Sequence, residues 1–149
     1  MRIPFFNKRK RTPTLYQKGI ENEFALNKRA QYYLVRLFSG ENKPENMLEF
    51  IFEQVFIIYQ LAQFAGSHEV SNHARKALRM LRQDFEDLYA KSLYILQAET
   101  AIACSRALKM GEPVLQELPR SEFKLAYVQA KRITETRNGI TNYLKVFHD

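Results

Sequence analysis

The sequence is poor in the residues that interrupt or cross-link a chain. It has one cysteine, no tryptophan, five glycines and five prolines among 149 residues. So few glycines and prolines exclude a loop-rich all-β fold. The single cysteine, Cys104, cannot form an intramolecular disulfide, and its apolar neighbours predict a small buried side chain rather than a reactive thiol. This cysteine usage fits a reducing compartment, so we expect a cytoplasmic protein, or a nuclear one if the source is eukaryotic.

Long uninterrupted hydrophobic runs are also missing. The most hydrophobic stretch, Met47–Ala65, contains two glutamates and three glutamines, which argues against a transmembrane segment. Residues 1–6 place their apolar side chains before the basic cluster, the reverse of the order in a secretory signal peptide. Glycine-rich phosphate-binding loops, the Gly-x-Ser-x-Gly motif and the His-Glu-x-x-His motif are absent. The sequence therefore predicts no catalytic residues and no cofactor.

Acidic residues are absent from residues 1–13, and this stretch carries much of the positive charge. The net charge is +7, and because 5 of the 23 basic residues lie here, the rest of the chain carries only +2. Two prolines and four consecutive basic residues make this stretch a poor helix or strand. We therefore predict a flexible basic arm over residues 1–13 and a single helical domain over residues 14–149. The four consecutive basic residues are Lys8, Arg9, Lys10 and Arg11.

Three interpretations of the basic arm are open from the sequence. Its cations would release counterions from a DNA or RNA backbone, which favours nucleic-acid binding. With Phe5 and Phe6 the arm would also suit an anionic membrane surface, and in a eukaryotic chain it resembles a nuclear import signal. The third interpretation is a solvated tail that only aids solubility.

Helical periodicity dominates the remainder of the chain. Apolar residues spaced by three and four positions predict a first helix over Leu15–Phe38, which Ser39 and Gly40 end. A second helix is predicted over Pro44–Ala65, because Pro44 suits a first helical position. This second segment is apolar on nearly all sides, so we expect it at the centre of a bundle or partly in an oligomer interface.

No glycine or proline occurs between Gly66 and Gly111, and this run favours one unusually long helix over residues 68–110 rather than two helices. An apolar stripe follows one face, and it is strongest before Leu96. The later half is rich in alanine and other small residues, which predicts close packing against another helix. The stripe consists of Ala74, Leu78, Leu81, Phe85, Leu88, Ile95 and Ile102.

A last helical segment follows Pro119. Ser121 is a suitable N-cap, and Asn138-Gly139 is a helix-stop signal that separates a short helix over Ile140–Phe147. Long helical segments with short connections predict an all-α antiparallel bundle of four to five helices. The long third helix also suggests a homo-oligomer, with a dimer favoured, because one small domain does not cover such a rod.

Basic residues also recur on one predicted helix. They have the spacing of a surface that could follow a phosphate backbone together with the arm. The alternative is a solvated face, since Asp84, Glu86 and Asp87 follow and could pair with it. The candidate nucleic-acid-binding residues on this helix are Arg75, Lys76, Arg79 and Arg82.

A carboxylate–histidine metal site is the sharpest enzymatic hypothesis. Glu49 and Glu53 are one helical turn apart, while Glu69 and His73 follow on the next segment with His68. Helical di-metal proteins use Glu-x-x-His, in which the residues are three positions apart. Here they are four apart and no second Glu-x-x-His exists, so these residues are better explained as polar surface.

These observations favour a non-enzymatic nucleic-acid-binding protein with an accessory or regulatory role, which contacts DNA or RNA through the arm. The chief alternative is a protein–protein interaction adaptor, an oligomeric helical bundle that binds a protein partner and in which the arm has no nucleic-acid role. A metal-dependent or hydrolytic enzyme ranks third.

Overall fold

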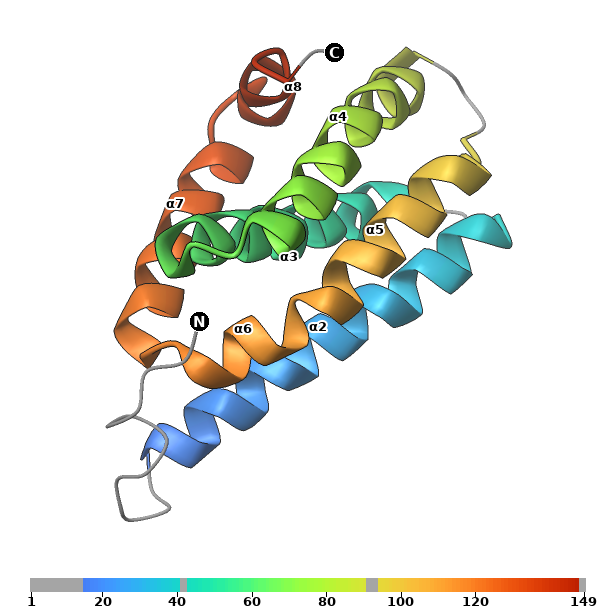
Figure 1. The fold of residues 1–149 in the computed structure, drawn as a ribbon. Helices are drawn as coiled ribbons and strands as arrows, with labels where there is room; N and C mark the ends of the chain where they lie inside the picture. The colour runs from blue at the N-terminus through green and yellow to red at the C-terminus, as the bar shows by residue number, and fades with distance from the viewer. Residues whose placement is uncertain (1–14, 41–42, 91–93, 148–149) are drawn as a thin grey trace.

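The computed structural model describes residues 15–40, 43–90 and 94–147, with side chains from residue 22 onward. These residues form α-helices and contain no β-strand, which confirms the predicted all-α bundle (Figure 1), and they form more helices than the four to five predicted. The helices that they form are α2 Leu15–Phe38, α3 Pro44–Ala65, α4 His68–Ala90, α5 Ala98–Met110, α6 Glu112–Glu117, α7 Arg120–Glu135 and α8 Gly139–Leu144.

Helix α3 is the centre of the bundle, as its nearly continuous apolar sequence predicts. It packs against α2, α4, α5, α6 and α7. Side chains on all of its faces are buried, including Leu48, Phe52 and Ile58. Each such side chain stabilises the fold by ~1.5–3 kcal/mol relative to exposure. The other helices are therefore placed by the need to cover α3.

The expected bounds of α2 and α3 are confirmed at both ends. Pro44 occupies the start of α3, where a missing N–H has no intrahelical partner to lose. Gly66 ends α3 with φ 73°, a left-handed conformation that favours glycine. There the Ser67 N–H donates to the Ala62 carbonyl at 2.9 Å, and the Gly66 N–H to that of Gln63 at 3.2 Å. This Schellman turn sends the chain directly into α4.

The predicted single helix over residues 68–110 is wrong. Helix α4 ends at Ala90, and after residues 91–93, which lie outside the described part, residues 94–97 are not helical. Helix α5 then packs back against α4 (Figure 1). The chain reverses although no glycine or proline is present, so the cause is not a local helix breaker.

A buried carboxylate, Asp84, holds this reversal in place. Its side chain is 0% exposed. The Tyr94 hydroxyl donates to Oδ1 at 2.7 Å, the Gln97 backbone N–H donates to the same oxygen at 3.1 Å, and the Thr100 hydroxyl donates to Oδ2. Gln97 is the N-cap of α5 and makes no side-chain cap of its own. Asp84 therefore supplies from α4 the acceptor that the start of α5 needs.

The small residues of α5 allow the close approach that their sequence predicts. Ala103, Cys104 and Ala107 are buried, and α5 contacts α4, α2 and α3. The prediction that Cys104 is a buried small side chain is confirmed. Burial, with the Asp84 carboxylate as a second cause, raises the pKa of the Cys104 thiol. Because the contacts lie within the chain, the helix over 68–110 no longer supplies an argument for a dimer.

The carboxyl-terminal segment follows the expected order, but its helix bounds differ: the last helix, α8, covers Gly139–Leu144 and not the predicted Ile140–Phe147. Helix α7 begins at Arg120 with Pro119 at the N-cap position, so Ser121 lies inside the helix and is not the cap. The stop at Asn138-Gly139 is confirmed, with Asn138 in the left-handed region at φ 58°. A Cβ on Gly139 would lie 2.0 Å from the Ile133 carbonyl oxygen, so only glycine fits there. The short α8 then packs on α4 and α7.

Removal of the Asp84 carboxylate should loosen the α4–α5 pair. Asp84→Ala leaves three donors without their acceptor in a buried position, and we expect a loss of about 3 kcal/mol in the free energy of unfolding. Urea denaturation followed by circular dichroism measures this loss.

The matched control is Glu86→Ala on the same helix. Glu86 is exposed, and among the described residues it accepts only a 3.4 Å contact from Arg82 Nε, so its loss should cost less than about 1 kcal/mol. Equal stability of the two variants would contradict the role assigned to Asp84.

Candidate functional site

Of the eight predicted nucleic-acid-binding residues, the four on α4 belong to the described part of the chain. The basic arm with Lys8, Arg9, Lys10 and Arg11 lies outside the described residues. Its role stays a prediction.

The four basic residues of α4 face in two directions. The Arg75 guanidinium lies 5.7 Å from the centre of the Phe147 ring, and Arg82 contacts Glu86. Arg79 also makes an interaction within the protein. Lys76 instead points to the junction of α4 with α5. Arg75, Arg79 and Arg82 keep the predicted i, i+4 and i+7 spacing on α4, and their role in nucleic-acid binding stays a prediction.

The residues of the metal hypothesis are separated as well. Glu53 is buried on α3, where its carboxylate accepts hydrogen bonds from the Thr134 hydroxyl at 2.8 Å and from Lys131 Nζ at 3.2 Å. Glu69 and His73 line two different hollows. In the described part of the chain no three His, Cys, Asp or Glu side chains are grouped as metal ligands. Burial and the neighbouring Glu45 and Glu53 raise the pKa of Glu49.

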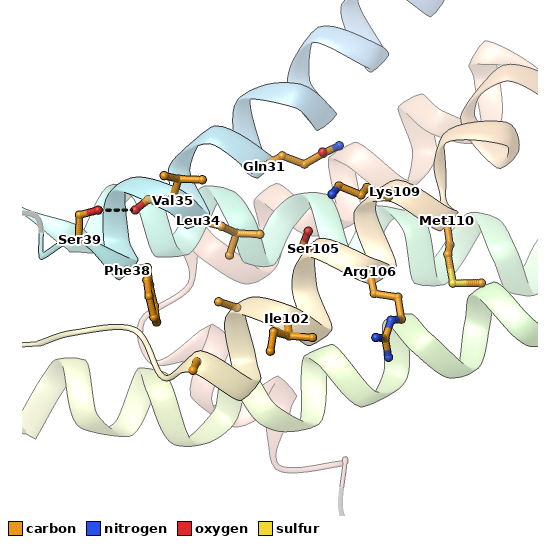
Figure 2. Close-up of a pocket in the computed structure, with 12 residues that line it drawn as sticks. Gln31, Leu34, Val35, Phe38, Ser39, Ile102, Ser105, Arg106, Lys109 and Met110 are labelled. Carbon is orange, nitrogen blue, oxygen red and sulfur yellow. Dashed lines mark hydrogen bonds between the residues drawn. The ribbon is translucent and has the colours of Figure 1, made fainter.

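A groove of about 610 Å³ lies between α2 and α5 (Figure 2). We call it the α2–α5 groove. Leu34 forms its buried floor, and Phe38 projects from α2 toward Ile102 of α5. Its lining residues are Gln31, Leu34, Val35, Phe38, Ser39, Ala98, Ala101, Ile102, Ser105, Arg106, Lys109 and Met110.

Each wall of the groove is one stripe of one helix. The α2 residues have the spacing i, i+3, i+4 and i+7 from Gln31, and the α5 residues repeat that spacing from Ala98. Such a stripe normally packs against another helix. Val35, Phe38 and Ile102 are nevertheless 65%, 54% and 57% exposed. The groove is therefore a helix-packing surface that no described helix covers.

One end of the groove is closed by a polar cluster. Lys28 Nζ and Gln31 Nε2 donate to Glu112 Oε2 at 2.8 and 3.1 Å. Partial desolvation would raise the pKa of Glu112, but these bonds outweigh it and lower the pKa. Nearby, the Asn27 side-chain amide donates to the Leu108 carbonyl at 3.0 Å and joins α2 to α5. These contacts hold the two walls together at this end.

A second hollow, of about 150 Å³, lies between α4 and α5. We call it the basic recess. It shares Ile102 and Arg106 with the α2–α5 groove, so these two side chains form the ridge between the hollows. In Figure 2 the Arg106 guanidinium points away from α2. The residues of the recess are His73, Lys76, Met80, Glu99, Ile102, Ala103 and Arg106.

A further buried acid lies on α2 away from both hollows. Glu23 is 2% exposed, and its Oε2 accepts no hydrogen bond from the part of the chain that the structure describes. Burial raises the pKa of Glu23 to about 7, opposed by the positive charge of Arg120. The group has no role in the groove, but it affects the stability of the helix that forms one wall.

No match to this chain is found among family models, curated proteins or solved structures. The surface is therefore interpreted from its own residues. None of the helices in the described residues is long and apolar enough to cross a membrane.

The sequence contains one sign of the groove, a second apolar stripe on α2, but periodicity alone does not say whether that stripe is covered. Val35 and Phe38 extend a second apolar stripe beside the core stripe of α2. Ile102 was expected on the core stripe of one long helix, and it is exposed because α5 is a separate helix. Helix separation, not composition, therefore created the groove.

Glu23 predicts a pH dependence of stability. Because its folded pKa of about 7 lies above the ordinary glutamate pKa of 4.5, the folded state holds the proton more tightly. Stability should therefore be full below about pH 4.5 and fall as the pH rises toward 7, by at most about 1.4 kcal/mol per pH unit. Glu23→Gln should remove this fall, which urea titrations at about pH 5, 6, 7 and 8 would measure. An unchanged pH profile in the variant would contradict the assignment.

Proposed function

We propose that this protein is a protein–protein interaction module that binds an amphipathic helix of a partner in the α2–α5 groove. The observation that carries the proposal is the pair of uncovered helix-packing stripes, one on α2 and one on α5, with a hollow between them. A helix laid in such a groove buries its apolar face against both walls. Large exposed apolar side chains that converge on one groove are typical of interaction surfaces.

The charge at the rim selects the kind of helix. Arg106 and Lys109 both lie on the α5 side and are exposed. Lys109 has the Glu112 carboxylate nearby, whereas Arg106 makes no ion pair or hydrogen bond within the described residues. A partner helix with acidic residues beside its apolar stripe would complement this rim.

The size of the groove sets the length of the partner helix. The lining residues of α5 run from Ala98 to Met110, which corresponds to about 18 Å at about 1.5 Å per residue. A partner segment of about 12 residues, or three turns, would cover that wall. Binding would bury three side chains that are now more than half exposed, namely Val35, Phe38 and Ile102.

A second copy of this chain is a poorer occupant than an acidic partner. The chain has a net charge of +7, and each copy would bring the same basic rim to the contact. Like charges at an interface oppose association. Nucleic-acid binding through the arm remains a separate prediction, since no described contact bears on it.

Selection of a helical peptide library against the full chain tests the proposal. We expect enrichment of peptides with apolar residues at i, i+3, i+4 and i+7 and with acidic flanks. Ile102→Glu should weaken their binding by at least about tenfold, because it places a charge in the apolar wall. Leu125→Glu is the matched control, since Leu125 is 56% exposed on α7 and Ile102 is 57% exposed. Isothermal calorimetry measures both affinities.

Two results would overturn this proposal. One is that no selected peptide distinguishes Ile102→Glu from Leu125→Glu. The other is a dimer, measured by sedimentation equilibrium, that Ile102→Glu dissociates and Leu125→Glu does not, because the groove would then be occupied by a second copy.

A further inference from the structure

We infer that the basic recess binds an anionic side chain, a carboxylate or a phosphate monoester, carried by the helix that occupies the α2–α5 groove. This inference rests on the proposed function and names the group that gives the partner its specificity. It goes beyond the general charge of the rim because it assigns one anion to one hollow between α4 and α5.

The recess brings together basic side chains from two helices. His73 and Lys76 are one turn apart on α4, and Arg106 faces them from α5. Ala103 is small and buried, and Met80 and Ile102 complete the apolar part of the lining. A volume of about 150 Å³ is large enough to accommodate a carboxylate or a phosphate group.

Glu99, the single acid of the recess, lies at the end opposite to Lys76 and Arg106. The Asp84 carboxylate accepts a hydrogen bond from Thr100, and α5 runs back along α4 from there. Residues earlier in α4 therefore face residues later in α5. Lys76 is eight positions before Asp84 and Arg106 is six after Thr100, which places both roughly 9–12 Å from that contact. Glu99 is next to Thr100, about 10 Å along the helix from Arg106.

The positive charges of Lys76 and Arg106 have no counterion within the described residues. Both side chains are exposed, and neither makes an ion pair or hydrogen bond within the described residues. Two cations held near each other without a counterion repel, and an anion between them relieves that repulsion. Arg106 can also donate two parallel hydrogen bonds to a carboxylate or phosphate, which adds geometric selectivity.

The groove and the recess are connected so that one ligand can use both. Ile102 and Arg106 belong to both linings, so a helix in the groove lies next to the recess across this ridge. A glutamate or phosphoserine on the edge of that helix would extend past Ile102 toward Lys76. A helix with the same apolar face but with no anionic side chain at this edge would fill the groove and leave the recess empty.

A set of three peptides tests the inference. The best peptide from the library selection is made with glutamate, phosphoserine or glutamine at the position beside the ridge. Each is titrated against the wild type and against Arg106→Gln. We expect the glutamate and phosphoserine peptides to lose about tenfold in affinity with Arg106→Gln, while the glutamine peptide changes less than about twofold. Lys76→Gln should give the same pattern.

Lys109→Gln is the matched control. Lys109 lies on the same helix and lines the groove but not the recess, so this variant removes the same charge outside the proposed site. It should weaken the three peptides alike. The peptide that loses more affinity with Arg106→Gln, the glutamate or the phosphoserine one, carries the anion that the recess prefers.

The inference is overturned if Arg106→Gln weakens the glutamine peptide as much as the charged ones, or if glutamate and glutamine peptides bind the wild type equally. Phe38→Glu separates this failure from failure of the docking groove, because Phe38 lines the groove but not the recess. If Phe38→Glu still weakens binding of all three peptides, the groove stands and only the anion site is wrong.

Discussion

The three hydrogen bonds to the buried Asp84 carboxylate determine the shape of the surface that we assign to binding. A carboxylate with no exposed area is costly to bury, and it is stabilised here because Tyr94, Gln97 and Thr100 all donate to it. Burial raises the pKa of Asp84, and these same bonds oppose that shift. Because all three donors lie after the chain reversal, the carboxylate fastens α5 against α4. That contact fixes the start of α5, the helix that contributes to both hollows.

Packing around α3 explains why one helix pair retains an open face. The buried side of α5 is made of small residues such as Ala103 and Ala107, so α5 sits close to its neighbours. The opposite side has Ile102 and Arg106, which have no covering helix in the described structure. An apolar surface of this kind costs solvation free energy in the free protein, and a bound helix recovers it. The proposed function thus follows from the uncovered stripe rather than from any reactive group.

Local sequence patterns predicted most of the helices correctly. Pro44 and Gly66 determine the ends of α3 through the missing proline N–H and the glycine left-handed turn, and both effects act within a few residues. Asn138-Gly139 separated α7 from α8 for the same reason. The single helix over 68–110 was wrong because its interruption depends on Asp84, ten or more positions from its partners. Helix propensity reflects the absence of glycine and proline from this segment. It contains no information on a hydrogen-bond acceptor, such as the Asp84 carboxylate, that is ten or more positions from its donors.

By itself, the sequence determined the helical class, the central place of α3 and the concentration of charge in the arm, since periodicity and composition are local properties. Tertiary structure decided which stripe is covered and which cations meet. Lys76 and Arg106 are 30 positions apart, and only the reversal between α4 and α5 brings them to one hollow. It also moved Ile102 from an expected core stripe to an open groove. A surface made by two helices depends on their packing, and packing is not encoded in the pattern of either helix alone.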